Sequence, residues 1–157
     1  MSYDADRYPL ASLLPQTGVM CLLDRLLEVS DESAKAQLQI SRNSLFSLPD
    51  GSVPAWVGLE YMAQTIAAWS GYHCLRQGEQ IRIGLLLGTR HYDSRSPVFR
   101  PGSVLTIRAH KLFEAANHMC VFECVIEEAG ELARARLNVL LPPDLRPYLQ
   151  NHQEFFE

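Results

Sequence analysis

The 157-residue sequence lacks the features that mark several large classes of protein. It has no uncharged apolar run of about 18 residues, and no basic stretch leads into an apolar one at the N-terminus. We therefore predict neither a membrane span nor a signal peptide, and we expect a cytoplasmic protein. Lysine and arginine total 14 against 18 acidic residues, with no basic stripe, which argues against a nucleic-acid partner.

Short motifs for cofactors and metals are missing as well. The sequence contains no GxGxxG, P-loop, HExxH or GxSxG motif, so we predict no nucleotide cofactor and no metal. The cysteines form no CxxC pair and lie within apolar stretches, which favours ordinary buried thiols over a disulfide or a metal site. They are Cys21, Cys74, Cys120 and Cys124.

The length and the apolar pattern predict one domain with one long helix. A chain of this length buries roughly 70% of its unfolded surface, which is enough for a single core. Residues 53–78, VPAWVGLEYMAQTIAAWSGYHCLRQG, are apolar on nearly every side, as in a helix that protein surrounds. Ser52 and Pro54 are typical of a helix start, and Gly78 is typical of a helix end.

Two polar side chains interrupt this helix, Glu60 and Gln64, which are one turn apart. A carboxylate inside an apolar helix is paired, neutralised or functional. The alternatives to a functional role are an ion pair with Arg25 or Arg82, or a hydrogen bond with Gln64. The function of the protein depends on which of these applies.

The remaining apolar segments predict strands. Apolar and polar residues alternate over residues 34–40, which indicates a half-buried strand. Residues 20–29 are its predicted hairpin partner, although their spacing also fits a short helix. Four strands follow the helix, and the first is continuously apolar, as is typical of a central strand covered on both faces. They span residues 81–89, 104–110, 119–127 and 132–141.

Two strands, one helix and four strands predict an α+β fold. A single antiparallel sheet that wraps around the helix is the simplest arrangement, and it is the hotdog architecture. We expect residues 1–157 to form one hotdog domain, with an N-terminal segment over 1–18 and a C-terminal tail over 144–157.

Residues 14–25, LPQTGVMCLLDR, resemble the LPHR-x-PFLLVDR opening of the FabZ-type 3-hydroxyacyl-acyl-carrier-protein (ACP) dehydratases. Pro54, Glu60, Ala63 and Gln64 match the PGV-x-x-x-E-x-x-AQ segment of that family at the same spacing. The chain thus resembles FabZ/FabA-like hotdog dehydratases over most of its length. The segment VPAWVGLEYMAQTIAA, residues 53–68, most closely resembles the ApeP-like dehydratases of aryl-polyene gene clusters. The resemblance implies dehydration of a 3-hydroxyacyl thioester, carried on ACP or CoA, in fatty-acid or polyene biosynthesis.

The departures from the family pattern concern the catalytic histidine. In the FabZ pattern it stands fourteen residues before the helix glutamate, where this sequence has Phe46. The histidine of the LPH opening is replaced by Gln16, and the glycine after the helix proline is Ala55, which keeps its N–H group. Phe46 and Gln16 therefore stand at substrate-binding positions without an imidazole.

Dehydration needs a base for the α-proton, an acid for the departing hydroxyl and donors for the thioester oxygen. The resemblance implies that Glu60 is the acid and that Gln64 orients it. The free amides at the helix N-terminus, those of Ala55 and Trp56, would hold the thioester oxygen. The general base is missing from this pattern.

The histidines offer no evident base. His73 lies about 19 Å along the helix from Glu60, too far to share one site. His91 follows a predicted strand and is a candidate for the edge of the site. Three hypotheses therefore stay open: a dehydratase with rearranged catalysis, a catalytically weak subunit completed by the histidine of a hotdog partner, and a thioesterase that uses Glu60. A homodimer or a hotdog heterodimer is expected, because sites of this fold commonly form between two subunits.

Two further groups of residues have alternative interpretations. Four arginines could contact the acidic surface of ACP or the phosphate of its pantetheine arm, or form a solvated basic edge: Arg82, Arg90, Arg95 and Arg100. Four large apolar residues could line an acyl tunnel or belong to an ordinary core: Met20, Trp56, Met62 and Trp69.

Overall fold

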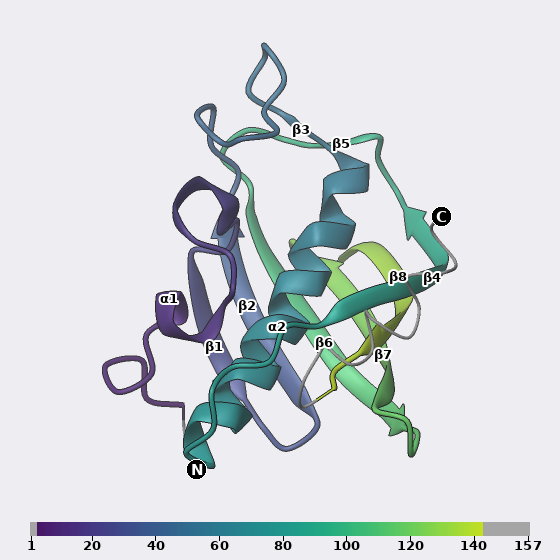
Figure 1. The fold of residues 1–157 in the computed structure, drawn as a ribbon. Helices are drawn as coiled ribbons and strands as arrows, with labels where there is room; N and C mark the ends of the chain where they lie inside the picture. Colours follow the sequence, from purple (N-terminus) through teal and green to yellow (C-terminus); the bar gives the residue numbers. More distant parts are fainter. Residues whose placement is uncertain (1–2, 143–157) are drawn as a thin grey trace, which may run out of the picture.

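A long helix, α2 (Gly58–Arg76), lies across one face of a six-stranded antiparallel sheet in the computed structural model, which describes residues 3–142 (Figure 1). The strand order is β1-β2-β6-β7-β8-β4. The hotdog prediction is confirmed, whereas the predicted tail over 144–157 lies outside the described residues. The strands are β1 (Arg25–Val29), β2 (Ser33–Gln39), β4 (Leu85–Ser94), β6 (Val104–Glu114), β7 (Met119–Glu127) and β8 (Glu131–Leu140).

The helix begins several residues later than the sequence pattern indicates. Val53–Pro54 form a short strand, β3, which pairs with a second short strand from after the helix, β5 (Val98–Phe99). One 3-10 turn, η2 (Ala55–Val57), then connects β3 to the helix. The prediction of Ser52 as N-cap is wrong, because its hydroxyl donates to the Asp50 carboxylate at 2.6 Å. Pairing of the preceding residues with a loop far along the chain delays the helix.

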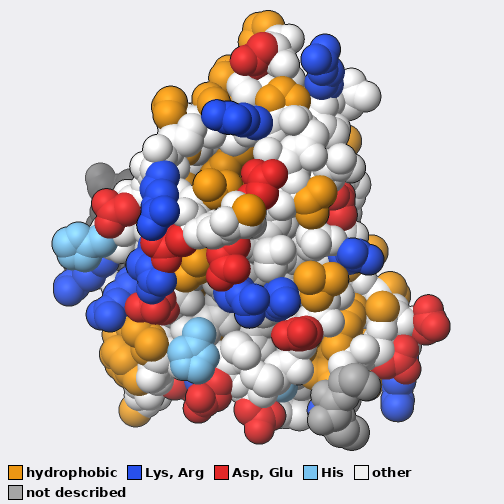
Figure 2. Space-filling model, turned by 180° about the vertical axis from the view of Figure 1, so that it is seen from behind, with side chains coloured by type: hydrophobic (Ala, Val, Ile, Leu, Met, Phe, Trp, Pro, Cys, Tyr) orange, Lys and Arg blue, Asp and Glu red, His pale blue; other side chains and the backbone are white. Residues whose placement is uncertain are grey.

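The core forms between α2 and the inner face of the sheet. Residues of β7 alternate strictly between buried and half-buried, so every second side chain points at the helix. The helix contributes Met62, Ile66 and Trp69 to this layer, all of them buried. The outer face is charged, and Figure 2 shows basic and acidic side chains interspersed on it. Ion pairs such as Arg134–Glu123, at 2.8 Å, connect neighbouring strands there.

The prediction that the first strand after the helix is central is wrong. β4 starts at Leu85, pairs with β8 alone among the strands of residues 3–142, and forms one edge of the sheet. Leu86 and Leu87 are each 47% exposed. An apolar run indicates that a strand becomes covered, but it does not indicate whether the same chain provides the cover.

The N-terminal segment packs along α2 through a short helix, α1 (Leu10–Leu13), and a 3-10 turn, η1 (Gly18–Met20). The predicted strand over 20–29 therefore begins only at Arg25. Before that point the backbone of Met20 and Leu22 bonds to a helix side chain, Gln64, instead of to a strand.

The four cysteines are free thiols, as the sequence indicates. Cys74, Cys120 and Cys124 are buried, and Cys21 is half-buried. Burial raises the pKa of the Cys120 and Cys124 thiols, which keeps them protonated near neutral pH. No helix in the described part of the chain is long and apolar enough to cross a membrane.

Candidate functional site

Glu60 and Gln64 contact each other in the first half of α2. Gln64 is fully buried, and its amide nitrogen donates to Glu60 Oε1 at 3.1 Å and to the Met20 carbonyl at 2.8 Å. Its amide oxygen accepts from the Leu22 N–H at 2.8 Å. Three hydrogen bonds thus fix the Gln64 side chain, and through it one oxygen of the half-buried Glu60 carboxylate is held in place.

The arginines that were alternative partners of Glu60 are engaged elsewhere. Arg25 donates to Gln37 at 2.7 Å, and Arg82 pairs with Glu79 at 3.2 Å. Glu60 forms no ion pair with any basic residue between positions 3 and 142. Of the structural alternatives, only the hydrogen bond with Gln64 is present.

Glu60 lies within a partly uncovered stripe of α2. We define the open stripe as Trp56, Leu59, Glu60, Ala63 and Ala67, which follow one another at helical spacing and are half-buried or exposed. Trp56 is 62% exposed, and the exposed leucines of β4 add to the uncovered apolar surface. An apolar helix face and an unpaired apolar edge strand are typical of a surface that another protein covers.

The helix start presents one of the two predicted amide donors. The Ala55 N–H donates to the Pro97 carbonyl at 2.9 Å, so it is already engaged. The Trp56 N–H has no acceptor among the described residues, and it is the candidate donor for a thioester oxygen. On the other side of the same peptide, the Tyr92 hydroxyl donates to the Ala55 carbonyl.

Sequence reasoning missed Tyr92 because no spacing rule marks it. Its strand, β4, has an irregular register against β8 between Arg90 and Asp93, and this bulge turns Tyr92 towards the helix. A bulge changes the alternation of a strand in a way that depends on its partner strand. The sequence of β4 by itself does not contain that information.

Phe46 contacts the helix start directly. Its ring meets the Trp56 ring edge to face, with centroids 5.7 Å apart. Position 46, where the FabZ pattern has its histidine, therefore lies beside Trp56. A hollow of about 400 Å³ lies beside Phe46, and its wall includes Leu22, Ile40 and Tyr61. Gln16 is not part of this wall; its buried Oε1 has no hydrogen-bond partner among the described residues.

The comparisons with known proteins show the family of the chain. The sequence model of the ApeP-like family, described as ApeP dehydratase, matches residues 8–150. The chain belongs to the ApeP-like dehydratase family. A solved chain of "The Dehydratase Heterocomplex ApeI:P from Xenorhabdus doucetiae" is 34% identical, with a TM-score of 0.83, and the match covers 90% of this chain and 95% of that one. The resemblance inferred from the sequence is confirmed.

More distant structures resemble the ApeP-like chain in fold alone. Cj0977, a virulence protein of Campylobacter jejuni, is 17% identical over 91% of this chain and 94% of its own, with a TM-score of 0.58. A hypothetical thioesterase of Streptococcus pneumoniae, solved with coenzyme A, is 13% identical over 74% of this chain and 86% of its own, with a TM-score of 0.59. A search of curated proteins found no match.

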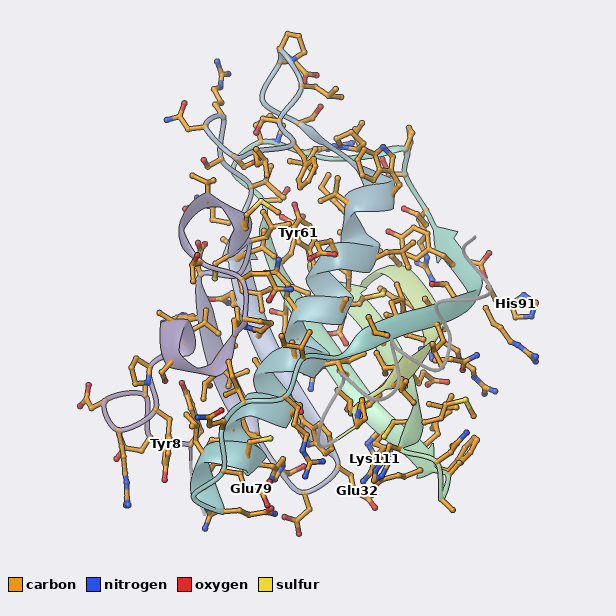
Figure 3. The ribbon with its side chains drawn as sticks, in the orientation of Figure 1. Tyr8, Glu32, Tyr61, Glu79, His91 and Lys111 are labelled. Atoms are coloured by element: carbon orange, nitrogen blue, oxygen red, sulfur yellow. The ribbon has the colours of Figure 1, made fainter. Side chains whose placement is uncertain are left out.

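The histidines within residues 3–142 of this ApeP-like chain do not supply a base to Glu60. The His73 ring lies 2.9 Å from the Ser30 carbonyl at the far end of the helix. His91 is exposed on the bulge of β4 and points away from α2 (Figure 3). His110 and His118 are exposed on and after β6, and none of these four hydrogen-bonds Glu60. His152 lies outside the described residues.

The four arginines do not gather at the site. Arg95 and Arg100 line one hollow of about 430 Å³, whereas Arg90 lines another on the outer face, where it stands opposite Arg136. Of the proposed tunnel residues, Met62 and Trp69 belong to the core, whereas Met20 and Trp56 are exposed. Within residues 3–142 no three His, Cys, Asp or Glu side chains cluster as metal ligands would.

Proposed function

We propose that this chain is one subunit of a hotdog dehydratase heterodimer that acts on a 3-hydroxyacyl-ACP in polyene biosynthesis. The observation that carries the proposal is the position of Glu60, held by Gln64 on a stripe that the described chain leaves open. The 34% identity to a chain of a dehydratase heterocomplex supports a partner subunit of the same kind.

The partner would supply the general base. Phe46 stands at the histidine position, and no histidine of the described chain bonds to Glu60. A homodimer would place a second Phe46 at its other site, so both sites would lack an imidazole there. A histidine-bearing hotdog partner would instead complete the site that contains Glu60.

The chemistry then divides between the two subunits. The partner's imidazole removes the α-proton, and the electron pair moves towards the thioester carbonyl, whose oxygen accepts a hydrogen bond from the Trp56 N–H. The pair then forms the α,β double bond as the 3-hydroxyl group leaves. Glu60, in its protonated form, donates the proton that converts the departing hydroxyl to water. Gln64 holds Glu60 Oε1, so the carboxyl group keeps one orientation during the step.

The proposal is tested by assaying 3-hydroxyacyl-ACP with three preparations: this chain, its histidine-bearing hotdog partner, and the co-purified pair. Mass spectrometry of the acyl-ACP follows the loss of one water. We expect rapid dehydration by the pair and little by this chain alone. Equal rates for the pair and for the partner alone would indicate a non-catalytic subunit. Release of free acid and ACP thiol would indicate a thioesterase instead.

A further inference from the structure

Tyr92 lies at the helix start although it comes from the edge strand of the sheet. The bulge of β4 places two residues, His91 and Tyr92, between Arg90 and Asp93, which remain paired with β8. His91 adopts a left-handed backbone conformation, with φ 57°, that residues other than glycine rarely adopt. The result is that His91 points outward and the Tyr92 hydroxyl reaches the Ala55 carbonyl.

The Ala55 carbonyl and the Trp56 N–H belong to one peptide unit. In a trans peptide the two groups point in opposite directions, so a donor on the carbonyl side fixes where the N–H points. The Ala55 oxygen accepts from both the Tyr92 hydroxyl and the Gly58 N–H. A carbonyl that accepts hydrogen bonds polarises its own peptide, which makes the N–H on the other side a stronger donor.

The surroundings hold the Tyr92 hydroxyl in this position. A Cβ atom at Gly58 would overlap the hydroxyl, and it would lie only 2.9 Å from Ile126 Cδ1 and 3.2 Å from the Phe99 ring. Glycine at position 58 thus allows the hydroxyl to approach the backbone. Burial raises the pKa of Tyr92 to about 12, so the hydroxyl keeps its proton and remains a donor near neutral pH.

We propose that Tyr92 is a positioning residue for the dehydration, because its hydroxyl orients and polarises the Ala55–Trp56 peptide whose N–H binds the thioester oxygen. The inference rests on the proposed function and adds a residue from the edge strand to the site. It also gives the β4 bulge a role, since a regular strand would not turn Tyr92 inward at this point.

The test compares Tyr92→Phe with Tyr72→Phe, near the far end of α2, in the co-purified heterodimer. Both substitutions remove the hydroxyl of a tyrosine that packs against the core, but Tyr72 lies about 18 Å along α2 from Glu60. Loss of one hydrogen bond corresponds to a roughly 3- to 10-fold effect. We expect Tyr92→Phe to lower kcat by about that factor, with KM and melting temperature close to those of Tyr72→Phe, whose kcat stays at the wild-type value.

An infrared measurement separates polarisation from a general loosening of the helix start. An unreactive acyl-pantetheine thioester, ¹³C-labelled at its carbonyl, is bound to the heterodimer, and its carbonyl band reports the strength of the hydrogen bond. Tyr92→Phe should move the band to higher wavenumber. Replacement of Tyr92 by 3-fluorotyrosine, a stronger donor, should move it to lower wavenumber. An unchanged band, or a shift in the same direction for both replacements, would overturn the proposal.

A Glu60→Gln heterodimer distinguishes this proposal from the one on which it rests. If Glu60→Gln abolishes dehydration and Tyr92→Phe leaves kcat and the carbonyl band unchanged, only the positioning role is wrong. If neither substitution lowers the rate, the proposed function is wrong and the positioning role fails with it.

Discussion

Two neighbouring stripes of α2 differ in what covers them. The clamped stripe, Gln64 and Gly71, lies against the N-terminal segment: Gln64 bonds to the backbone of Met20 and Leu22, and Gly71 touches the backbone of Leu13. The open stripe, from Trp56 to Ala67, has little cover from the described chain. Glu60 belongs to the open stripe but contacts Gln64 of the clamped one.

This difference gives one apolar helix both a structural side and a candidate functional side. Where the chain covers its own helix, side chains are fixed by packing and by satisfied backbone groups. Where the chain does not cover the helix, the apolar side chains remain at least partly exposed and are available for contact with another protein. The Glu60 carboxyl group at the boundary is held by the first stripe and partly exposed on the second, which is the arrangement that the proposed site between two subunits requires.

The sharpest contrast comes from adjacent alanines. Ala68 is fully buried, whereas Ala67 lies on the open stripe. Ala68→Glu should prevent folding, because an unpaired buried charge costs at least several kcal/mol. Ala67→Glu should fold with a near wild-type melting temperature but bind its hotdog partner at least about tenfold more weakly, since a charge enters the interface. Circular dichroism and analytical ultracentrifugation measure the two effects. An Ala67→Glu chain that binds normally would show that the open stripe is not the interface.

Gln64→Ala should destabilise the chain by about 3 kcal/mol. The substitution leaves the Met20 carbonyl and the Leu22 N–H without their partner, and each unsatisfied buried group costs about 1–3 kcal/mol. Urea denaturation gives the free energy of unfolding. Gln77→Ala is the matched control, because Gln77 is exposed just after the same helix. If Gln64→Ala lowers the free energy of unfolding by less than about 0.5 kcal/mol, the range of ordinary surface substitutions, the hydrogen bonds of Gln64 do not stabilise the N-terminal segment as described.

Gly71→Ala should destabilise by about 2 kcal/mol, against the usual preference of helices for alanine. A Cβ atom at this position would lie 2.9 Å from the Leu13 carbonyl carbon and 3.0 Å from its Cα, so the N-terminal segment must move. Gly78→Ala does not serve as a control, because Gly78 has φ 74°. Ala67→Ser does, and it should change the free energy of unfolding by less than about 0.5 kcal/mol. A Gly71→Ala chain that is more stable than the wild type would show that the N-terminal segment around Leu13 does not pack tightly against the helix.

The smallest of these predicted effects on stability at neutral pH comes from Tyr92. Burial raises the pKa of this residue in the folded chain to about 12, compared with about 10 when the chain is unfolded. The folded state therefore retains a proton that the unfolded state loses, so this contribution to stability is complete below about pH 10 and disappears as the pH rises through about 12. Denaturation curves across this range should decline less steeply for Tyr92→Phe than for the wild type. Parallel curves would contradict the assigned pKa.

The sequence predicts the local and periodic parts of this fold well. The alternation over 34–40 corresponds to β2, Ser33–Gln39, and Gly78, whose φ is 74°, directly follows the C-cap residue of α2, Gln77. Both signals depend on residues close in the chain. A hydrogen bond between Glu60 and Gln64 was one of the alternatives that their spacing allowed, and it is present at 3.1 Å.

The features that the sequence did not reveal depend on distant parts of the chain. The helix starts late because Val53 and Pro54 pair with β5, and the strand before it is shortened because Gln64 bonds to the backbone of Met20 and Leu22. The edge position of β4 and the inward turn of Tyr92 arise from pairing with β8. No periodicity within a short segment contains these relations.

The most direct test of the account is the dehydration rate of the heterodimer with Glu60→Gln in this chain. The amide can still accept the hydrogen bond from Gln64, but it cannot donate the proton to the leaving hydroxyl. We predict a loss of at least about 100-fold with unchanged assembly and melting temperature, while Glu28→Gln, at an exposed position of β1, has no effect. A Glu60→Gln heterodimer that dehydrates 3-hydroxyacyl-ACP within threefold of the wild-type rate, about 0.6 kcal/mol, would contradict the central claim.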